Sequence, residues 1–274
     1  MSVKSYLYLG LIGLVLTSCT EVIELDLEGI EPQVVIEAEV DATNGVAIVS
    51  LTQSQDLYND GAFTALEGAQ VELFVDGTAI SIPEESAGSY RAADLNLNSG
   101  QELVMEVTLA DGQQFTASSQ VPNQAQFDTL IVNPALGLGG GFGNPMGEGS
   151  DEPMYEIIVG WDDIPEEENF YRVKLYEDDQ FLSDAYLLTD DQLGEGGTIT
   201  RLLIGQQFPE GAELRVELLT TSEGYFRYFT DIANRGGFGG GGAATPYNPT
   251  SNFSGDILGF FGVWQVVEQT VIAE

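Results

Sequence analysis

Carboxylates are the most abundant side chains in this sequence that could do chemistry. The chain of 274 residues holds 44 Asp and Glu but only 8 Lys and Arg, one Cys and no His. Without His, the sequence excludes Ser-His-Asp and Cys-His catalysis and zinc sites that use imidazole ligands. The formal net charge of −36 repels phosphate backbones, so we expect no nucleic-acid partner.

Four Asp residues in two acidic segments are the candidates for a cation site. Asp162 and Asp163 follow one predicted strand, and Asp178 and Asp179 follow the next. Calcium prefers about six to eight oxygen ligands, which neighbouring β-loops can supply together. The sequence contains no D-x-[DN]-x-[DN]-G loop, so a calcium site here would have to be assembled from separate loops. The interpretation we favour is a solvated acidic rim that keeps the protein soluble, with no bound metal or other cofactor.

Carboxylic acids can also hydrolyse glycosides, which needs a pair about 5–10 Å apart with one pKa raised. With 44 acidic residues, the sequence does not single out such a pair. Lys174 alternates with apolar residues along a predicted strand, which places it on the solvent side and argues against a Ser-Lys dyad or a Schiff base. We therefore predict that the protein is not an enzyme, with a carboxylate-based glycoside hydrolase as a minor alternative.

The first 18 residues have the features of a targeting signal. Lys4 precedes an apolar run over residues 6–16, which would span about 16 Å as a helix and is too short to cross a bilayer. The segment ends in Leu16-Thr17-Ser18-Cys19, which resembles the lipobox of bacterial lipoproteins. That resemblance implies removal of a signal peptide, residues 1–18, and acylation of Cys19, so that the acyl chains anchor the protein in the outer membrane. An ordinary secretory signal with an incidental Cys is the alternative, but the absence of any other Cys favours lipidation.

Residues 19–30 are expected to form an acidic tether. Thr20 follows the Cys in place of an Asp, which in familiar systems favours passage to the outer membrane. The acidic residues of the tether are Glu21, Glu24, Asp26 and Glu28. This stretch resembles the signal with which Bacteroidota send lipoproteins to the cell surface, so we expect a lipid-anchored protein that faces the cell exterior. A solvated tether whose charges stand off the membrane is a compatible alternative.

Short β-strands are the elements that must position the remaining residues. Val34, Ile36, Ala38 and Val40 recur at the period of two that is typical of a strand. Thr43-Asn44-Gly45 predicts a hairpin turn, because Asn-Gly accepts positive φ. Further strands are expected over residues 46–54, 69–76, 78–82, 89–92, 102–109 and 113–121. This spacing predicts an immunoglobulin-like or transthyretin-like β-sandwich over residues 31–122.

A second β-domain is expected over residues 126–274. Its candidate strands are residues 127–132, 155–161, 170–176, 181–188, 199–204, 212–220 and 257–267. Val159–Asp162 followed by Tyr171–Val173 resembles a fibronectin type III sheet. The expected fold class is therefore all-β, with two tandem immunoglobulin-like or fibronectin-like sandwiches behind the signal peptide.

One helix is predicted near residues 222–235, where Ser222 can cap the first turn. Its aromatic face would carry Tyr225, Tyr228, Phe229 and Ile232, which recur at helical spacing. We expect this stripe to pack on the second sheet rather than to form a platform for a ligand.

Two glycine-rich segments, residues 134–153 and 236–244, interrupt the second domain. Neither contains the GxxxxGK[ST] pattern of a phosphate-binding loop. Long loops that project from a rigid sandwich suit partner docking, so Phe142, Phe238 and the nearby Tyr247 are candidate partner contacts. A flexible spacer without a specific partner is the alternative.

Several segments of the sequence together resemble a known family. They are Gly68–Leu73, Gly88–Tyr90, Glu168–Val173, Ser222–Tyr228 and a C-terminal Pro249-Thr250-Ser251-Asn252-Phe253 that continues through Gly255 to Leu258–Phe261. In their order and spacing they are similar to the Bacteroidota lipoproteins classified as domain of unknown function 4249. The resemblance implies a two-domain β-lipoprotein whose gene often lies beside that of a TonB-dependent outer-membrane transporter.

The function implied by this resemblance is an accessory role in nutrient uptake. We expect a non-catalytic surface lipoprotein whose partner is a TonB-dependent transporter barrel, on which it docks or for which it captures a ligand. A structural, assembly or adhesion subunit of another outer-membrane complex is the alternative.

Overall fold

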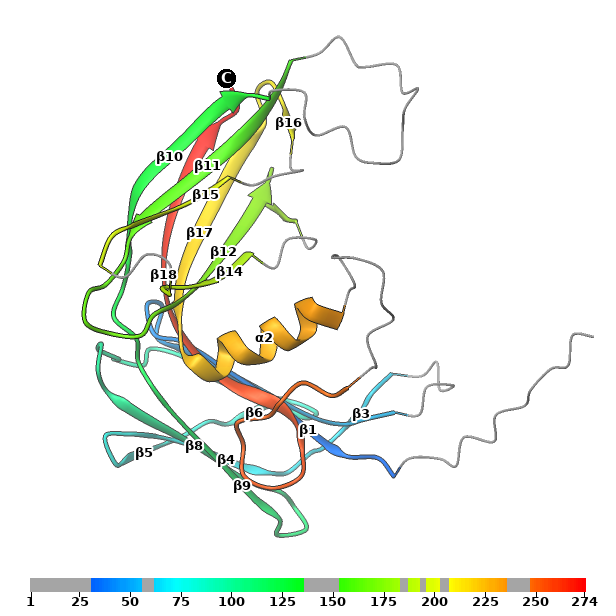
Figure 1. Cartoon of the computed structure of the whole chain (residues 1–274). Helices are drawn as coiled ribbons and strands as arrows, with labels where there is room; N and C mark the ends of the chain where they lie inside the picture. The colour runs from blue at the N-terminus through cyan, green and yellow to red at the C-terminus, as the bar shows by residue number, and fades with distance from the viewer. Residues whose placement is uncertain are drawn as a thin grey trace, which may run out of the picture. The chain divides into compact units, whose positions relative to one another are not determined.

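Alternation of apolar and polar residues along short strands builds three open β-sheets (Figure 1). The computed structural model describes residues 31–55, 62–135, 153–182, 187–192, 196–202, 207–235 and 247–274, and these comprise strands and one helix. Residues Pro32–Glu274 belong to one unit. The expectation of a mainly-β protein with one short helix is confirmed. No helix in these described ranges has the length and apolar character needed to cross a bilayer.

The largest sheet joins ten strands from both ends of the chain. Its order is β13 (Gln180–Phe181), β12 (Phe170–Glu177), β17 (Glu213–Thr221), β18 (Leu258–Ile272), β1 (Val34–Asp41), β2 (Val46–Gln53), β7 (Ser89–Ala92) and β6 (Glu84–Ser86). Two further strands pair beside this path, β14 (Leu187–Asp190) with β12 and β3 (Thr64–Ala65) with β2. One face of the sheet is covered by the two smaller sheets, and we call the opposite face the outer face.

The two smaller sheets have four strands each. One has the order β5 (Thr78–Ser81), β4 (Gln70–Val75), β8 (Glu102–Thr108) and β9 (Gln114–Gln120). The other has the order β10 (Gln126–Pro134), β11 (Met154–Asp162) and β15 (Thr198–Leu202), with β16 (Phe208–Pro209) also paired to β11.

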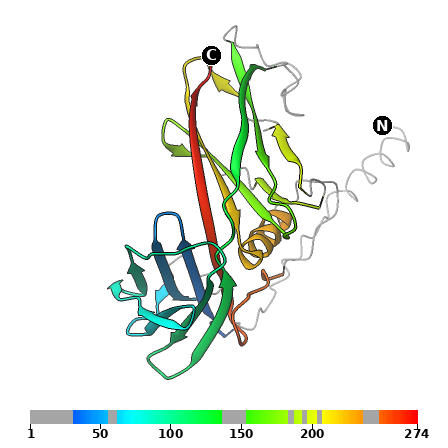
Figure 2. The ribbon, with the colours of Figure 1, turned by 90° about the vertical axis from the view of Figure 1, so that its left-hand side faces the viewer.

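Strand β18 connects the two halves of the large sheet. Its first part, Leu258–Trp264, runs parallel to β1, and its second part, Trp264–Ile272, runs antiparallel to β17. In Figure 2 this strand extends as one red arrow from beside the blue strands to the C-terminus. The parallel part requires a close approach at Gly259, where φ is +100° and an added Cβ would lie 2.0 Å from the carbonyl oxygen of Ile36.

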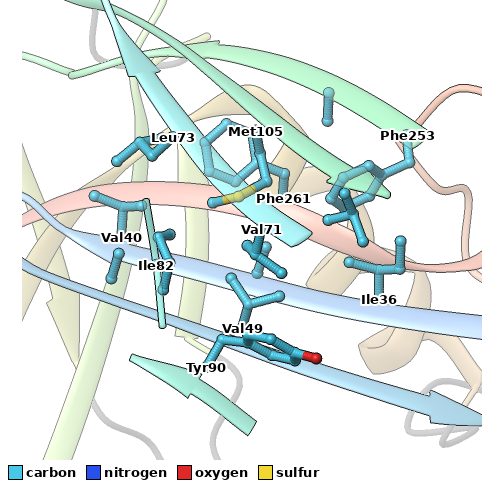
Figure 3. Packing of buried hydrophobic residues seen from close by; sticks show 14 of the residues in the cluster. Ile36, Val40, Val49, Val71, Leu73, Ile82, Tyr90, Met105, Phe253 and Phe261 are labelled. Atoms are coloured by element: carbon cyan, nitrogen blue, oxygen red, sulfur yellow. The ribbon is translucent and has the colours of Figure 1, made fainter. Parts of the chain in front are cut away.

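Two main hydrophobic cores lie between the sheets. The first joins β1, β2 and the start of β18 to β4, β8 and β9, and Figure 3 shows Ile36, Met105 and Phe261 among its packed side chains. The second joins β12, β17 and the end of β18 to β10 and β11, around the fully buried Trp161 and Tyr171. Full burial of a large apolar side chain contributes about 1.5–3 kcal/mol, so these clusters hold the sheets together.

The two cores divide near residues 123–126, where the joint between the two expected domains lies, but the large sheet is not divided there. Val121 packs in the first core and Ala125 in the second. The C-terminal segment nevertheless supplies Phe253, Ile257 and Phe261 to the first core, and β18 is the parallel neighbour of β1. The segment 31–122 therefore differs from the expected separate sandwich, because one of the strands that complete it comes from the far end of the chain.

The helix α2 (Glu223–Arg235) lies close to the expected range and packs on the outer face of the large sheet (Figure 1). The carbonyl of Ser222 accepts the N–H of Phe226 at 3.1 Å, as at the start of a helix. The Ser222 hydroxyl, expected to cap the helix, accepts the N–H of Val263 at 3.1 Å, while the Ser222 N–H donates to the Val263 carbonyl at 2.8 Å. The first turn is thus fixed to β18.

The aromatic stripe of α2 packs on the sheet as expected. The Tyr225 ring centroid lies 5.4 Å from that of Trp264, and the Tyr228 ring stacks on Phe260 at 4.5 Å. Gly262 makes room for this packing, because a Cβ there would lie 2.6 Å from Cδ2 of Tyr225.

Candidate functional site

A groove of about 820 Å³ lies where the two cores meet. Its walls come from the end of β9 and the following segment, the loop before β12, the junction of β17 with α2, and the segment before β18. The residues that line it are Gly100, Ser118–Asn123, Glu167–Phe170, Thr220–Gly224, Arg227 and Thr250–Asn252. Ligand sites are often found between packed units of this kind, and the volume suits a small ligand.

Hydroxyl, amide and carboxylate groups share the lining of this groove with apolar groups such as Val121, Pro122 and Phe170. Asn123 donates from its side-chain amide to both carboxylate oxygens of Glu167, at 2.8 and 2.9 Å. Arg227 pairs with Glu223 one turn earlier on α2, and both side chains are exposed, so the pair adds little stability. Glu168 adds a further negative charge. The groove therefore favours a polar ligand that is neutral or cationic and disfavours an anion.

The wall formed by the C-terminal segment is held by Asn252. Its side-chain amide donates to the carbonyl of Phe261 and accepts the Phe261 N–H, both at 2.8 Å. Gly224 at the start of α2 is required beside it, since a Cβ there would lie 2.3 Å from Nδ2 of Asn252. The Pro249–Phe253 motif thus has a structural role, because it ties the groove wall to both β18 and α2.

The loop that brings Glu167 and Glu168 to the groove is held by buried carboxylates. Asp163 accepts the hydroxyl of Tyr171 at 2.6 Å and the N–H of Gly196 at 2.8 Å. Asp191 accepts the N–H of Asn169 at 2.7 Å, and the Asn169 side chain donates to two loop carbonyls at 2.7 Å. Burial, and next the hydrogen bond to Asp163, raise the pKa of Tyr171 well above its ordinary value. These acids therefore serve the architecture of the loop.

The four Asp residues considered for calcium lie in two separate places. Asp163 contacts Tyr171 near the start of β12, and Asp162 accepts the Thr198 hydroxyl at 3.0 Å. Asp178 and Asp179 form the turn after β12, beyond its other end. The strand between them spans roughly 25 Å, so the structure does not bring the two pairs together. Among the described residues, no group of three or more acidic or Cys side chains is placed to hold a metal.

Three of the few cations gather on the outer face of β12 and β17. Arg172 is 6% exposed, donates to the Tyr225 hydroxyl and lies 4.6 Å from the centroid of Phe229. Arg215 stacks 3.7 Å from the Tyr176 ring centroid and pairs with the Glu217 carboxylate. The third cation is Lys174, and the carboxylates of Glu217 and Glu39 lie near it, so this region of the outer face carries both signs of charge.

Lys174 points away from the core, as its alternation predicts, but it is not freely solvated. Its Nζ lies 5.4 Å from the centroid of Trp264. Burial, and next the charge of Arg172, lower the pKa of Lys174, while Glu217 and Glu39 act in the opposite direction. The sequence did not reveal this environment because α2 and β18 come from distant parts of the chain.

Of the three predicted partner contacts, Tyr247 is the one that lies within the described residues. Tyr247 is 47% exposed, and its hydroxyl donates to Asp231 on α2 at 3.0 Å. Asp231 also accepts the N–H of Thr250 at 2.9 Å, so Tyr247 lies beside the segment that reaches the groove. The other predicted site residues, Cys19, Glu21, Glu24, Asp26, Glu28, Phe142 and Phe238, lie outside the described residues.

Sequence reasoning did not assign a site to the groove residues or to Arg172. The available signals were the polar run Thr250–Asn252 directly before a strand and the rarity of cations in this chain. Both signals are local, whereas the groove is formed by five segments that are distant in sequence.

Comparison with known proteins identifies the family. The profile described as Domain of unknown function (DUF4249) matches residues 20–270, and no curated protein sequence matches the chain. A solved structure, described as structural insight into host cell surface retention of a 1.5-MDa bacterial ice-binding adhesin, is similar at 11% sequence identity with a TM-score of 0.19. That alignment covers 88% of this chain and 65% of the other, so the chain spans less than two thirds of the length of that structure. Because the profile covers nearly the whole sequence, the chain belongs to the DUF4249 family.

Proposed function

We propose that this DUF4249 protein is a non-catalytic lipoprotein, anchored in the outer membrane through acyl chains on Cys19 and exposed at the cell surface. Its role is accessory to a TonB-dependent transporter, for which it captures a ligand or on which it docks. The observation that carries this proposal is the polar groove of about 820 Å³ where the two cores meet.

The chemistry of the groove supports binding rather than catalysis. The buried carboxylates next to it, Asp163 and Asp191, accept hydrogen bonds from backbone N–H groups and a Tyr hydroxyl, which fixes them in the loop structure. Groups that line the groove, such as Ser118, Asn123 and Thr250, offer many donors and acceptors that can recognise a polar ligand.

The lipobox and the family support the location and the partner. Leu16-Thr17-Ser18-Cys19 is the expected acylation motif, and the acidic residues after it are the expected surface signal. The association of family genes with TonB-dependent transporters suggests the barrel as the partner. Under this proposal the β-structure from Pro32 onwards presents the groove outside the membrane.

A pull-down from native membranes tests the partner. The tagged full-length chain is isolated in mild detergent with the variants Cys19→Ala, Ser118→Trp and Ser81→Trp, and co-purifying proteins are identified by mass spectrometry. Ser118 is exposed at the groove, whereas Ser81 is exposed on β5 away from it, so the two Trp variants are matched.

The proposal expects a stoichiometric TonB-dependent barrel with the wild type and its loss with Cys19→Ala. If the groove docks the barrel, Ser118→Trp alone lowers its recovery. If the groove captures ligand, recovery is unchanged and small molecules that co-purify with the wild type are lost from Ser118→Trp alone. Recovery of only other lipoproteins or surface polymers would contradict the transporter role and favour an assembly or adhesion subunit.

A further inference from the structure

We propose that a second, smaller pocket on the outer face of the large sheet binds the ammonium group of an amine. The pocket has a volume of about 240 Å³ and lies between α2 and strands β1, β2 and β18. It is separate from the groove, since the two share no lining residue, and the inference goes beyond the proposed function.

One wall of the pocket carries two carboxylates. Glu37 and Glu39 are two positions apart on β1, so their side chains stand on the same outer face, about 7 Å apart along the strand. Glu37 is exposed, whereas Glu39 is partly buried. On the neighbouring strand β2, Ser50 lies opposite Glu37 and Ile48 lies opposite Glu39. Carboxylate oxygens accept hydrogen bonds and attract a cation, so this wall suits an N–H⁺ donor.

The facing wall is aromatic. Tyr228 stacks on Phe260 with ring centroids 4.5 Å apart and an angle of 27°, and Phe229 meets Phe260 edge-on at 5.2 Å. The faces of aromatic rings attract ammonium groups, with more energy where the cation is desolvated. Aromatic rings on one side and carboxylates on the other are the combination that selects an organic cation. An anion would meet Glu37 and Glu39, and two carboxylates fall short of the oxygen ligands that calcium prefers.

The charges around Glu39 leave the pocket side open to a further cation. Lys174 and Arg172 act on Glu39 from β12, beyond β17 and β18, and Arg172 also lies 4.6 Å from the ring centroid of Phe229. These cations therefore stand on the β18 side of Glu39, whereas Ile48 and Ser50 of β2 line the opposite side of the pocket. The other titratable groups that face Glu39 are Glu37 and Asp41 on β1 and Tyr225 and Tyr228 on α2.

Burial raises the pKa of Glu39 above its ordinary value although Lys174 and Arg172 oppose the shift. A cation bound in the pocket favours the ionised form of this carboxylate, so ammonium binding and ionisation of Glu39 support each other. As the pH falls through the pKa of Glu39, its carboxylate is protonated and the affinity for an amine decreases.

The volume of about 240 Å³ is sufficient for an alkylammonium group of the size of a Lys side chain. The same chemistry is offered by a free alkylamine and by a Lys side chain of a protein partner. Butylammonium is a probe for the free amine, and acetyl-Gly-Lys-Gly-amide is a probe for a Lys in a polypeptide. Butanol and acetyl-Gly-norleucine-Gly-amide are the corresponding uncharged controls.

Binding to the full-length lipidated chain in detergent is measured by isothermal titration calorimetry. The variants are Glu39→Gln and Phe229→Leu in the pocket, with Glu102→Gln as a matched control, because Glu102 is exposed on β8 in another sheet. Thermal unfolding of each variant shows that it is folded. We expect butylammonium to bind the wild type and Glu102→Gln equally and each pocket variant about tenfold more weakly, which corresponds to about 1.4 kcal/mol.

Two arms of the experiment distinguish the sources of the amine. Binding of both charged probes indicates that a Lys of a partner can enter the pocket, and binding of butylammonium alone indicates a free amine. The inference is overturned if butanol binds as tightly as butylammonium, or if neither charged probe binds at millimolar concentration. It is also overturned if the Glu39→Gln variant binds butylammonium as tightly as the wild type does. None of these results affects the groove or its barrel partner.

Discussion

Gly259 is the residue whose replacement tests most directly how β18 joins β1. An added Cβ would lie 2.0 Å from the carbonyl oxygen and 2.6 Å from the carbonyl carbon of Ile36. These are backbone atoms of a paired strand, in which Ile36 is the register partner of Gly259, so they cannot rotate away as a side chain can. The φ of +100° is a second obstacle for any residue with a Cβ.

We expect Gly259→Ala to lower the free energy of unfolding by about 3–5 kcal/mol. The positive φ contributes about 1–2 kcal/mol. Moving the strands apart weakens two or three ladder hydrogen bonds at about 1 kcal/mol each. The sum is a large fraction of the roughly 5–15 kcal/mol that stabilises a typical protein.

Gly255→Ala is the matched control for this change. Its φ is +90°, but the nearest atoms to an added Cβ belong to the Phe115 ring, at 3.5 and 3.6 Å, which is ordinary contact. The free energy of unfolding of Gly255→Ala should therefore fall only by the cost of the positive φ, about 1–2 kcal/mol. Both variants are compared with the wild type by urea unfolding, followed by Trp fluorescence and linear extrapolation. Equal losses, within about 0.5 kcal/mol, would refute the argument that close packing of β18 on β1 is what requires Gly259.

Three further predictions concern named polar groups. Asn252→Ala should lower the free energy of unfolding by about 2–3 kcal/mol, measured by urea unfolding, because it removes two 2.8 Å hydrogen bonds to Phe261; an unchanged midpoint would contradict this role. Tyr171→Phe should remove from an ultraviolet titration a phenol that ionises above the ordinary Tyr pKa of about 10, because burial and the hydrogen bond to Asp163 raise the pKa of Tyr171 in the folded protein. The stability linked to this shift is present below about pH 10 and is lost as the pH rises further; a variant with the same high-pH titration as the wild type would refute the prediction. Glu39→Gln should raise the melting temperature near about pH 7, because the raised pKa of Glu39 means that folding disfavours its ionised carboxylate. This gain should vanish below about pH 4.3, the pKa of a Glu in the unfolded chain, and a gain that is independent of pH would count against the prediction.

Local patterns predicted the elements that depend on neighbouring residues. The alternation of Ile36, Ala38 and Val40 matches three side chains that are fully buried in β1. Asn44-Gly45 lies in the turn between β1 and β2, and the φ of Gly45 is +62°. The helical spacing of aromatic residues predicted α2 and its packing face, because that pattern is contained within one short segment.

Long-range pairing was beyond the reach of these patterns. Nothing in the local sequence of β1 indicates that Ile36 pairs with Gly259, because a parallel partner can come from any later strand. Alternation placed Arg172 and Lys174 on the outer face correctly, but it carried no information that α2 and Trp264 cover them. The groove was missed for the same reason, since Ser118 and Thr250 meet only in the folded chain.

Four consecutive residues of β18 link the core, the groove and the amine pocket. Phe260 lines the pocket, and Gly262 leaves room for Tyr225 of α2. Phe261 packs in the first core, and its backbone forms hydrogen bonds with the side chain of Asn252 at the groove. The backbone of Val263 forms hydrogen bonds with Ser222. Because these residues are neighbours in one strand, a substitution that shifts the backbone at one of them would disturb more than one of the three regions. Loss of binding caused by such a change would therefore not assign a ligand to either site. Ser118 and Glu39 each touch one site only and lie outside the cores, so changes at these two positions can separate the function of the groove from that of the pocket.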